Sequence, residues 1–242
     1  MQEGLASPAA AAAPSGGAAR SQTVGPLMEK QSAMKSISSL IETVIRAVAR
    51  ARFSILTIAL TYITFIIVGI VMTHTGNPFA LEARDRLVSK AMQHDPAAIA
   101  NNQGDSLRAA LLDFGGNLTL GAMSKTVSGL AVVIPYPLVA YQGWVGGIVS
   151  VRADHSSRLN NVRSALYYLL TLLLQVIPYS LAIGAGVNVG IAMLRPQPYY
   201  QGDKWLGILP KEAVLDVGRI YAFVIPLFLV ASLWEFLSPW NL

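Results

Sequence analysis

The sequence predicts an all-α membrane protein. The expected fold is a bundle of about four transmembrane helices, with an N-terminal amphipathic interfacial helix and a re-entrant or interfacial broken helix. Hydrophobic residues make up 53% of the 242 residues, charged residues only 13%, and the mean hydropathy is +0.49. A soluble domain of this length is more polar. Several apolar stretches also have the length of a membrane span.

The N-terminal part is predicted to lie outside the membrane. Residues 1–33 are rich in Ala, Pro and Gly and are expected to form a disordered tail. They lack the charged and apolar regions of a secretory signal. Residues 34–52 have a helical pattern of apolar side chains, with charged side chains on the other face, which indicates an amphipathic helix on the cytoplasmic surface of the membrane. The alternative is a helix packed on the protein's own cytoplasmic face.

Residues 53–242 form the predicted transmembrane domain. Its four spans are expected at residues 53–73, 126–151, 165–194 and 213–237. The first contains no charged residue and has about 21 residues, enough to cross about 30 Å of hydrocarbon. The second contains the proline pair Pro135 and Pro137, and the third is long enough to require a tilt or a kink near Pro178.

Residues 107–123 are also apolar but do not resemble a complete span. The stretch is short, and Gly115, Gly116 and Asn117 interrupt it. Irregular backbone at membrane depth occurs only where protein or water satisfies its polar groups. This segment is therefore predicted to be a re-entrant or interfacial helix, with its break at the two glycines.

Basic residues predict the orientation of the spans. They precede the first span and recur between the second and the third, at Lys30, Lys35, Arg46, Arg50, Arg52, Arg152, Arg158 and Arg163. Because short cytoplasmic loops are enriched in Lys and Arg, both regions are expected in the cytoplasm. With four spans, residues 74–106 and 195–212 lie outside and both termini lie inside.

No pattern in the chain indicates catalysis. The three histidines, His74, His94 and His155, fall in predicted loops without the spacing of a metal site, and cysteine is absent. Motifs of hydrolases, zinc proteases and phosphate-binding loops are missing. The net charge of +5 arises from basic residues beside apolar segments, which does not indicate nucleic-acid binding. The chain is predicted to be no enzyme and to hold neither metal nor cofactor.

Small and polar residues are the candidates for function. Small residues at intervals of four allow helices to approach closely in lipid, and they occur at Gly143, Gly147, Ala182, Gly186 and Gly190. Polar side chains near them need partners within the membrane, and the candidates are Asn117, Lys125, Gln142, Asn188 and Glu235. These side chains are expected to form either a structural polar cluster or a translocation site.

Three segments resemble the stage II sporulation protein M family of integral membrane proteins. They are residues 114–151, the stretch QVIPYSLAIGAGVNVG at 175–190, and AFVIPLFLVASLWEFLSPW at 222–240. The family's asparagine-containing break is matched at Gly116 and Asn117. Its polar-Gly-x-x-x-Gly pattern and its terminal Glu and Pro are matched at Gln142, Gly143, Gly147, Glu235 and Pro239.

The chain departs from the family at its Pro-His-Gly-x-x-Glu motif. Pro178 is kept, but Tyr179 and Ser180 replace the His and Gly, and Ile183 replaces the Glu. The resemblance covers about residues 50–242. It implies a multi-pass protein of the bacterial cytoplasmic membrane that serves as a scaffold rather than a hydrolase, and some relatives are encoded near ATPases.

Two functional hypotheses follow. The first is a non-catalytic membrane scaffold or accessory subunit, which binds membrane lipids and recruits other membrane subunits through the small-residue faces at 143–147 and 182–190. The second is a transporter or permease subunit that moves a small solute with a partner ATPase. In the second, the interrupted helices around residues 115–117 and Pro178 present helix ends to the solute.

Overall fold

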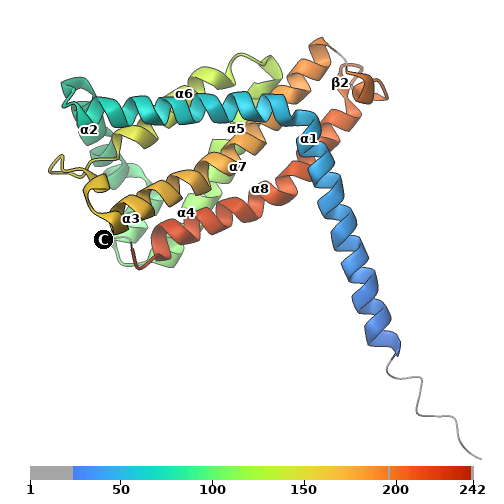
Figure 1. The fold of residues 1–242 in the computed structure, drawn as a ribbon, viewed down its shortest axis with the longest axis horizontal. Helices are drawn as coiled ribbons and strands as arrows, with labels where there is room; N and C mark the ends of the chain where they lie inside the picture. The colour runs from blue at the N-terminus through green and yellow to red at the C-terminus, as the bar shows by residue number, and fades with distance from the viewer. Residues whose placement is uncertain (1–23, 196, 241–242) are drawn as a thin grey trace, which may run out of the picture. The chain divides into compact units, whose positions relative to one another are not determined.

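The computed structural model describes residues 24–195 and 197–240, with side chains from Ser38 onward. The described chain is mostly helical (Figure 1). Within it, three helices are long and apolar enough to cross a membrane: α1 (Val24–His74, over its part Ser38–His74), α7 (Val162–Leu194) and α8 (Lys211–Leu237). The chain divides into two units, residues 1–42 and 43–242, and the described part of the first is helical.

Helix α1 joins two elements that the sequence predicted as separate. The expected interfacial helix 34–52 and the expected span 53–73 lie in one continuous helix. The reason is that residues 27–68 contain neither proline nor glycine, so nothing ends the helix between them. Residues 24–33 are also helical, so the predicted tail extended too far, while residues 1–23 lie outside the described part.

Three short helices follow α1: two lie in the predicted external connection 74–106, and the third covers the first part of the predicted re-entrant or interfacial segment 107–123. They are α2 (Pro78–His94), α3 (Pro96–Asn102) and α4 (Ser106–Gly116). The side chains of Asn77, Asp95 and Asp105 accept hydrogen bonds from the first backbone amides of these helices. A polar N-cap followed by proline is a strong helix-start signal, and it occurs twice here.

The predicted break at Gly115 and Gly116 is not an interruption of the helix. Helix α4 continues as the π-helix η1 (Asn117–Met123), then as α5 (Ser124–Ser128) and the 3₁₀ turn η2 (Gly129–Ala131). The chain first leaves helical conformation at Val132, whose φ is 58°. The irregular stretch is therefore a change of helical hydrogen bonding at Asn117 rather than an unwound segment.

The predicted span 126–151 is divided into separate elements, because the chain turns at Val132. Helix α6 (Pro135–Ile148) begins after the turn and has only 14 residues. Pro135 and Pro137 lie in its first turn, where proline is tolerated because the backbone amide there needs no helical partner. At its far end, the Ser150 hydroxyl lies 3.3 Å from the Thr73 hydroxyl of α1. Neither a fourth span nor a re-entrant helix is confirmed.

The last two long helices agree with their predicted spans of 165–194 and 213–237. Helix α7 has 33 residues and passes through Pro178 without a break, and α8 contains Pro226. The two helices run side by side (Figure 1). Between them lie the turn η4 (Pro198–Tyr200) and a short hairpin of β1 (Lys204–Trp205) and β2 (Leu209–Pro210). A further turn, η3 (Arg158–Asn160), precedes α7.

The small-residue faces pack within the chain itself. A Cβ atom built on Gly143 would lie 2.5 Å from the carbonyl oxygen of Tyr62, and Gly147 packs as closely on Ile66 of α1. A Cβ atom built on Gly190 would lie 2.6 Å from the carbonyl oxygen of Gly129. Gly186 meets Thr126, and Ala182 is fully buried beside them. These surfaces are therefore helix-packing contacts and are not open to a partner.

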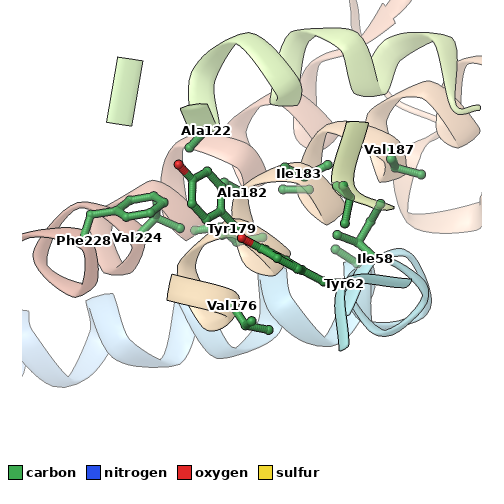
Figure 2. Close-up of a cluster of buried hydrophobic side chains, with 14 of the residues drawn as sticks. Ile58, Tyr62, Ala122, Val176, Tyr179, Ala182, Ile183, Val187, Val224 and Phe228 are labelled. Carbon is green, nitrogen blue, oxygen red and sulfur yellow. The ribbon is translucent and has the colours of Figure 1, made fainter. Parts of the chain in front are cut away.

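The core of the second unit lies where α1, α7 and α8 meet the π-helix. Figure 2 shows Tyr179 of α7 between Tyr62 of α1 and Phe228 of α8. The ring centroids of Tyr179 and Phe228 are 4.8 Å apart in an edge-to-face arrangement, and those of Tyr62 and Tyr179 are 6.2 Å apart. Such aromatic contacts stabilise a core beyond the burial of area alone.

The structure contradicts the predicted placement of the connections. The Nε2 atom of His74 lies 2.7 Å from the Ser157 hydroxyl, and the Nε2 atom of His155 lies 3.0 Å from an Asp85 carboxylate oxygen. Residues 74–106 and 152–163 therefore share one end of the second unit, although the charge pattern put them on opposite sides. Arg163 donates to the Pro239 carbonyl there, which places the end of α8 at that same end.

The charge pattern failed because basic residues occur at both ends of the second unit. Arg50 pairs with Asp216 near the start of α8, at the end opposite Pro239. Residues 43 and 240 thus lie at opposite ends, whereas four spans required both termini on one side. The predicted number of crossings was wrong because residues 126–151 were taken as one span. In the structure these residues belong to α5 and α6, which are the two arms of a hairpin.

Single-cysteine labelling tests this arrangement, because the natural chain contains no cysteine that would react. Ser89→Cys in α2 and Asp154→Cys before η3 replace exposed residues at one end, and Gly202→Cys replaces an exposed residue at the other. In sealed, oriented vesicles an impermeant maleimide should label Ser89→Cys and Asp154→Cys from the same side and Gly202→Cys from the opposite side. Labelling of Ser89→Cys and Asp154→Cys from opposite sides would contradict the structure.

Glycine substitutions test the internal packing. Gly147→Leu and Gly186→Leu insert a side chain where the neighbouring backbone is already in contact, so each should lower the free energy of unfolding by about 1–3 kcal/mol or more. Gly115→Leu is the matched control, because a Cβ atom there meets nothing within 4 Å. Thermal unfolding in detergent measures the difference. Equal melting temperatures for all three variants would show that these contacts are not tight.

Candidate functional site

A large cavity, partly open to the outside, lies in the second unit. Its volume is about 600 Å³, which is within the range of small-molecule sites. We call it the central cavity. Helices α2, α3, α4, α6, α7 and α8, the π-helix η1 and the turn η3 all contribute to its wall. The charged and amide side chains that line it are Arg84, Asp95, Asn101, Asn102, Asp113, Asn117, Gln142, Arg158, Gln175 and Glu235.

One wall of the central cavity carries two carboxylates held by neutral donors. The Asp113 carboxylate accepts hydrogen bonds from the Ser232 hydroxyl at 2.6 Å and from the Asn117 amide at 2.8 Å. The Tyr179 hydroxyl donates to the Asn117 side-chain oxygen at 2.7 Å. The Gln175 amide donates to the Glu235 carboxylate at 3.3 Å. This network joins α4, η1, α7 and α8.

Gln142 and Lys125 extend this network on the side of α6. The Lys125 ammonium group donates to the side-chain oxygen of Gln142, and it lies 5.0 Å from the centre of the Tyr179 ring. Gln142 and Tyr179 both line the central cavity. Of the predicted polar residues, Asn117, Gln142 and Glu235 therefore line one space, Lys125 contacts it through Gln142, and Asn188 lies elsewhere.

Two arginines occupy another part of the wall. Arg84 of α2 is 5% exposed, and one of its terminal nitrogens lies 2.8 Å from an Asp85 oxygen. Asp85 also contacts His155, and these two hydrogen bonds lower the pKa of its carboxyl group. Burial and the nearby charges of Arg84 and Arg152 lower the pKa of Arg158, which lies in η3. An arginine nevertheless stays charged in proteins.

Asn188 belongs to a separate charged cluster. Its amide donates to the Tyr200 hydroxyl at 2.9 Å, and Tyr200 donates to the Asp216 carboxylate at 3.0 Å. Asp216 is 2% exposed and pairs with both Arg50 and Arg219. Burial first, and then the Asp216 charge, raise the pKa of Tyr200 to about 12. This cluster fastens α1, α8 and η4 together and does not line the central cavity.

Sequence reasoning missed several lining residues. Asp113 was not among the candidate residues, and Tyr179 was noted only as a departure from the family motif. Arg158 was interpreted as a topology signal, and Arg84 and Gln175 were not singled out. Helical spacing could have placed Asp113 with Asn117, four residues later. Nothing in the sequence indicates that α2 and η3 reach the same cavity.

The lining supplies binding groups rather than a recognisable catalytic arrangement. Amides, phenols, carboxylates and guanidinium groups can hydrogen-bond a polar solute on several sides. Among the described residues, no three His, Asp or Glu side chains are placed to hold a metal ion. The three histidines end α1, end α2 and sit in the loop before η3, so they do not meet.

Comparisons of the chain with models of protein families, with curated proteins and with solved structures give no match.

The Asp216 cluster generates a stability prediction. Asp216→Asn keeps the shape of the side chain but removes the nearer counter-charge of Arg50 and leaves it only Glu212, at 3.7 Å, so the free energy of unfolding should fall by up to about 3–5 kcal/mol, the cost of breaking a buried ion pair. Asp203→Asn is the matched control, because Asp203 is exposed and its pair with Lys211 is long, at 3.9 Å. Thermal unfolding should separate the two variants clearly. If Asp216→Asn were as stable as Asp203→Asn, the cluster would not hold these helices together.

Proposed function

We propose that the protein is a membrane protein that binds a small polar solute in the central cavity, as the solute-binding subunit of a permease. The observation that carries this proposal is the cavity itself, about 600 Å³ in volume and lined by charged and amide side chains from seven helical segments. A protein whose only task is to hold helices together has no need of such a space, because small residues already pack its helices closely.

Placing charged side chains beside apolar helices costs free energy. Ionisable groups within membrane bundles cost several kcal/mol unless they are paired or hydrated, and they commonly mark solute pathways. Neutral side-chain donors form hydrogen bonds to the carboxylates of Asp113 and Glu235. Retention of these groups around a cavity supports a binding role.

The positions that carry the family resemblance support the same site. Asn117, Gln142 and Glu235 were matched from three separate motifs, and all three line the central cavity. Tyr179, which replaces the histidine of the family motif, hydrogen-bonds to Asn117. Membership of the stage II sporulation protein M family, and location in a bacterial cytoplasmic membrane, remain proposals that fit this convergence.

The π-helix is a suitable moving part. Single turns of π-helix are rare and occur frequently at functional sites, because their hydrogen bonds shift more easily than those of an α-helix. Here η1 contributes Asn117 to the cavity and continues into α5, the first arm of the hairpin. Irregular helices of this kind contribute to solute sites in secondary transporters. Rearrangement of η1 is the proposed way in which the cavity opens.

The scaffold hypothesis loses the surface on which it depended. Gly143, Gly147, Gly186 and Gly190 are buried against the chain's own helices, so they offer no docking face for another subunit. Other membrane subunits and a partner ATPase remain proposed partners of the permease, together with the surrounding lipids. A non-enzymatic role is part of the same proposal.

Cysteine protection tests whether the cavity binds a solute. Ala98→Cys places a thiol on the cavity wall, and Ala131→Cys places one on an exposed turn outside it. A water-soluble methanethiosulfonate reagent should modify both in nanodiscs. A bound solute at ten times its Kd should slow the reaction of Ala98→Cys about tenfold and leave Ala131→Cys unchanged.

The solutes tested in this experiment are glycerol, glycine, lysine, glutamate, putrescine and inorganic phosphate. Protection of Ala98→Cys by at least one of them supports the proposal, and uptake of that solute into proteoliposomes then tests transport. The proposal is contradicted if none of them slows Ala98→Cys more than Ala131→Cys.

A further inference from the structure

The two arginines of the central cavity are incompletely paired within the described chain. Arg84 is 5% exposed, yet its Nε atom is buried without a hydrogen-bond partner among the residues that the structure describes. The same holds for the buried Nε atom of Arg158. Both side chains line the central cavity. They come from α2 and η3, which are joined at this point by the contact between Asp85 and His155.

The carboxylates of the same cavity accept hydrogen bonds from other donors. Asp113 is held by Ser232 and Asn117, and Glu235 by Gln175. Asp95 accepts from the first amides of α3 as its N-cap. Within residues 38–195 and 197–240, no carboxylate forms an ion pair with Arg158, and Arg84 has one only with Asp85.

Guanidinium groups in this position favour an external counter-charge. Burying a cation costs free energy unless the cation is paired and hydrogen-bonded. Arginine cannot avoid this cost by deprotonation, because it stays protonated in proteins. Its planar group of donors matches the two oxygens of a carboxylate or the oxygens of a phosphate. A neutral solute would leave Arg158 without an ion-pair partner among the described residues, whereas an anion would supply one beside both arginines.

We infer that Arg84 and Arg158 bind an anionic group, a carboxylate or a phosphate, of the molecule that occupies the central cavity. This inference rests on the proposed solute-binding function and names its ligand class. The anion belongs either to a soluble molecule or to the headgroup of an anionic lipid that enters between the helices. The carboxylate wall around Asp113 and Glu235 then faces the remainder of the ligand.

Thermal unfolding in nanodiscs tests the inference. The soluble probes are inorganic phosphate and glutamate, added to protein in phosphatidylcholine nanodiscs. The lipid probe is phosphatidylglycerol, titrated into the nanodiscs without a soluble anion. A saturable rise in melting temperature with phosphate or glutamate indicates a soluble anion, and a saturable rise with phosphatidylglycerol alone indicates a headgroup. Either result supports the inference when it depends on Arg158.

Variants establish that dependence. Arg158→Gln should weaken apparent binding about 10- to 100-fold, the usual loss for a hydrogen bond to a charged group. Arg158→Lys keeps the charge without the planar fork and should recover part of the affinity. Arg86→Gln in α2 and Arg152→Gln in the loop before η3 are matched controls, because these arginines are exposed and do not line the cavity. Both should bind as the natural chain does.

Two results overturn the inference. The first is no saturable response to phosphate, glutamate or phosphatidylglycerol. The second is a response that Arg158→Gln and Arg152→Gln reduce equally, which indicates general surface charge. If either occurs while glycerol or lysine protects Ala98→Cys, the cavity binds a solute but not an anion, and only the inference fails. If nothing protects Ala98→Cys either, the proposed function fails with it.

Discussion

Close contact between helix backbones is the constraint on which the rest of this structure depends. The hairpin of α5 and α6 is held on one side against α1 by Gly143 and Gly147, and on the other against α7 by Gly186 and Gly190. In lipid, helices gain little from burying apolar area, so association depends on such close packing. The π-helix that leads into this hairpin places Ala122 in the hydrophobic core and Asn117 in the wall of the central cavity.

Charged groups divide into two kinds in this arrangement. At one end of the second unit, Asp216 balances Arg50 and Arg219 directly, and the cluster joins helices without a space between them. In the central cavity, carboxylates and guanidinium groups line the same space, and among the residues that the structure describes no direct ion pair joins Asp113 to Arg84 or Arg158. The first kind offsets the cost of burial internally. The second keeps its binding capacity for another molecule, which is the physical basis of the functional proposal.

The sequence predicted the long helices better than their connections. Helices α7 and α8 begin and end within three residues of the predicted spans, because long apolar stretches identify such helices reliably. The proline pair Pro135 and Pro137 was located but assigned to the interior of one span, since a proline at a helix start and a proline inside a span look alike in sequence. Asn117, Gln142 and Glu235 were found because a polar residue in an apolar segment needs a partner. Arg84 and Arg158 were not, because only the tertiary fold brings α2 and η3 together.

Native mass spectrometry of the protein released from nanodiscs tests the central claim, that the cavity holds a ligand, most directly. Ala98→Trp fills the cavity from α3, and Ala131→Trp adds the same side chain on an exposed turn outside it. The account predicts a discrete added mass on the natural chain and on Ala131→Trp, and its loss from Ala98→Trp. Equal added mass on all three proteins, or none on the natural chain, would contradict it.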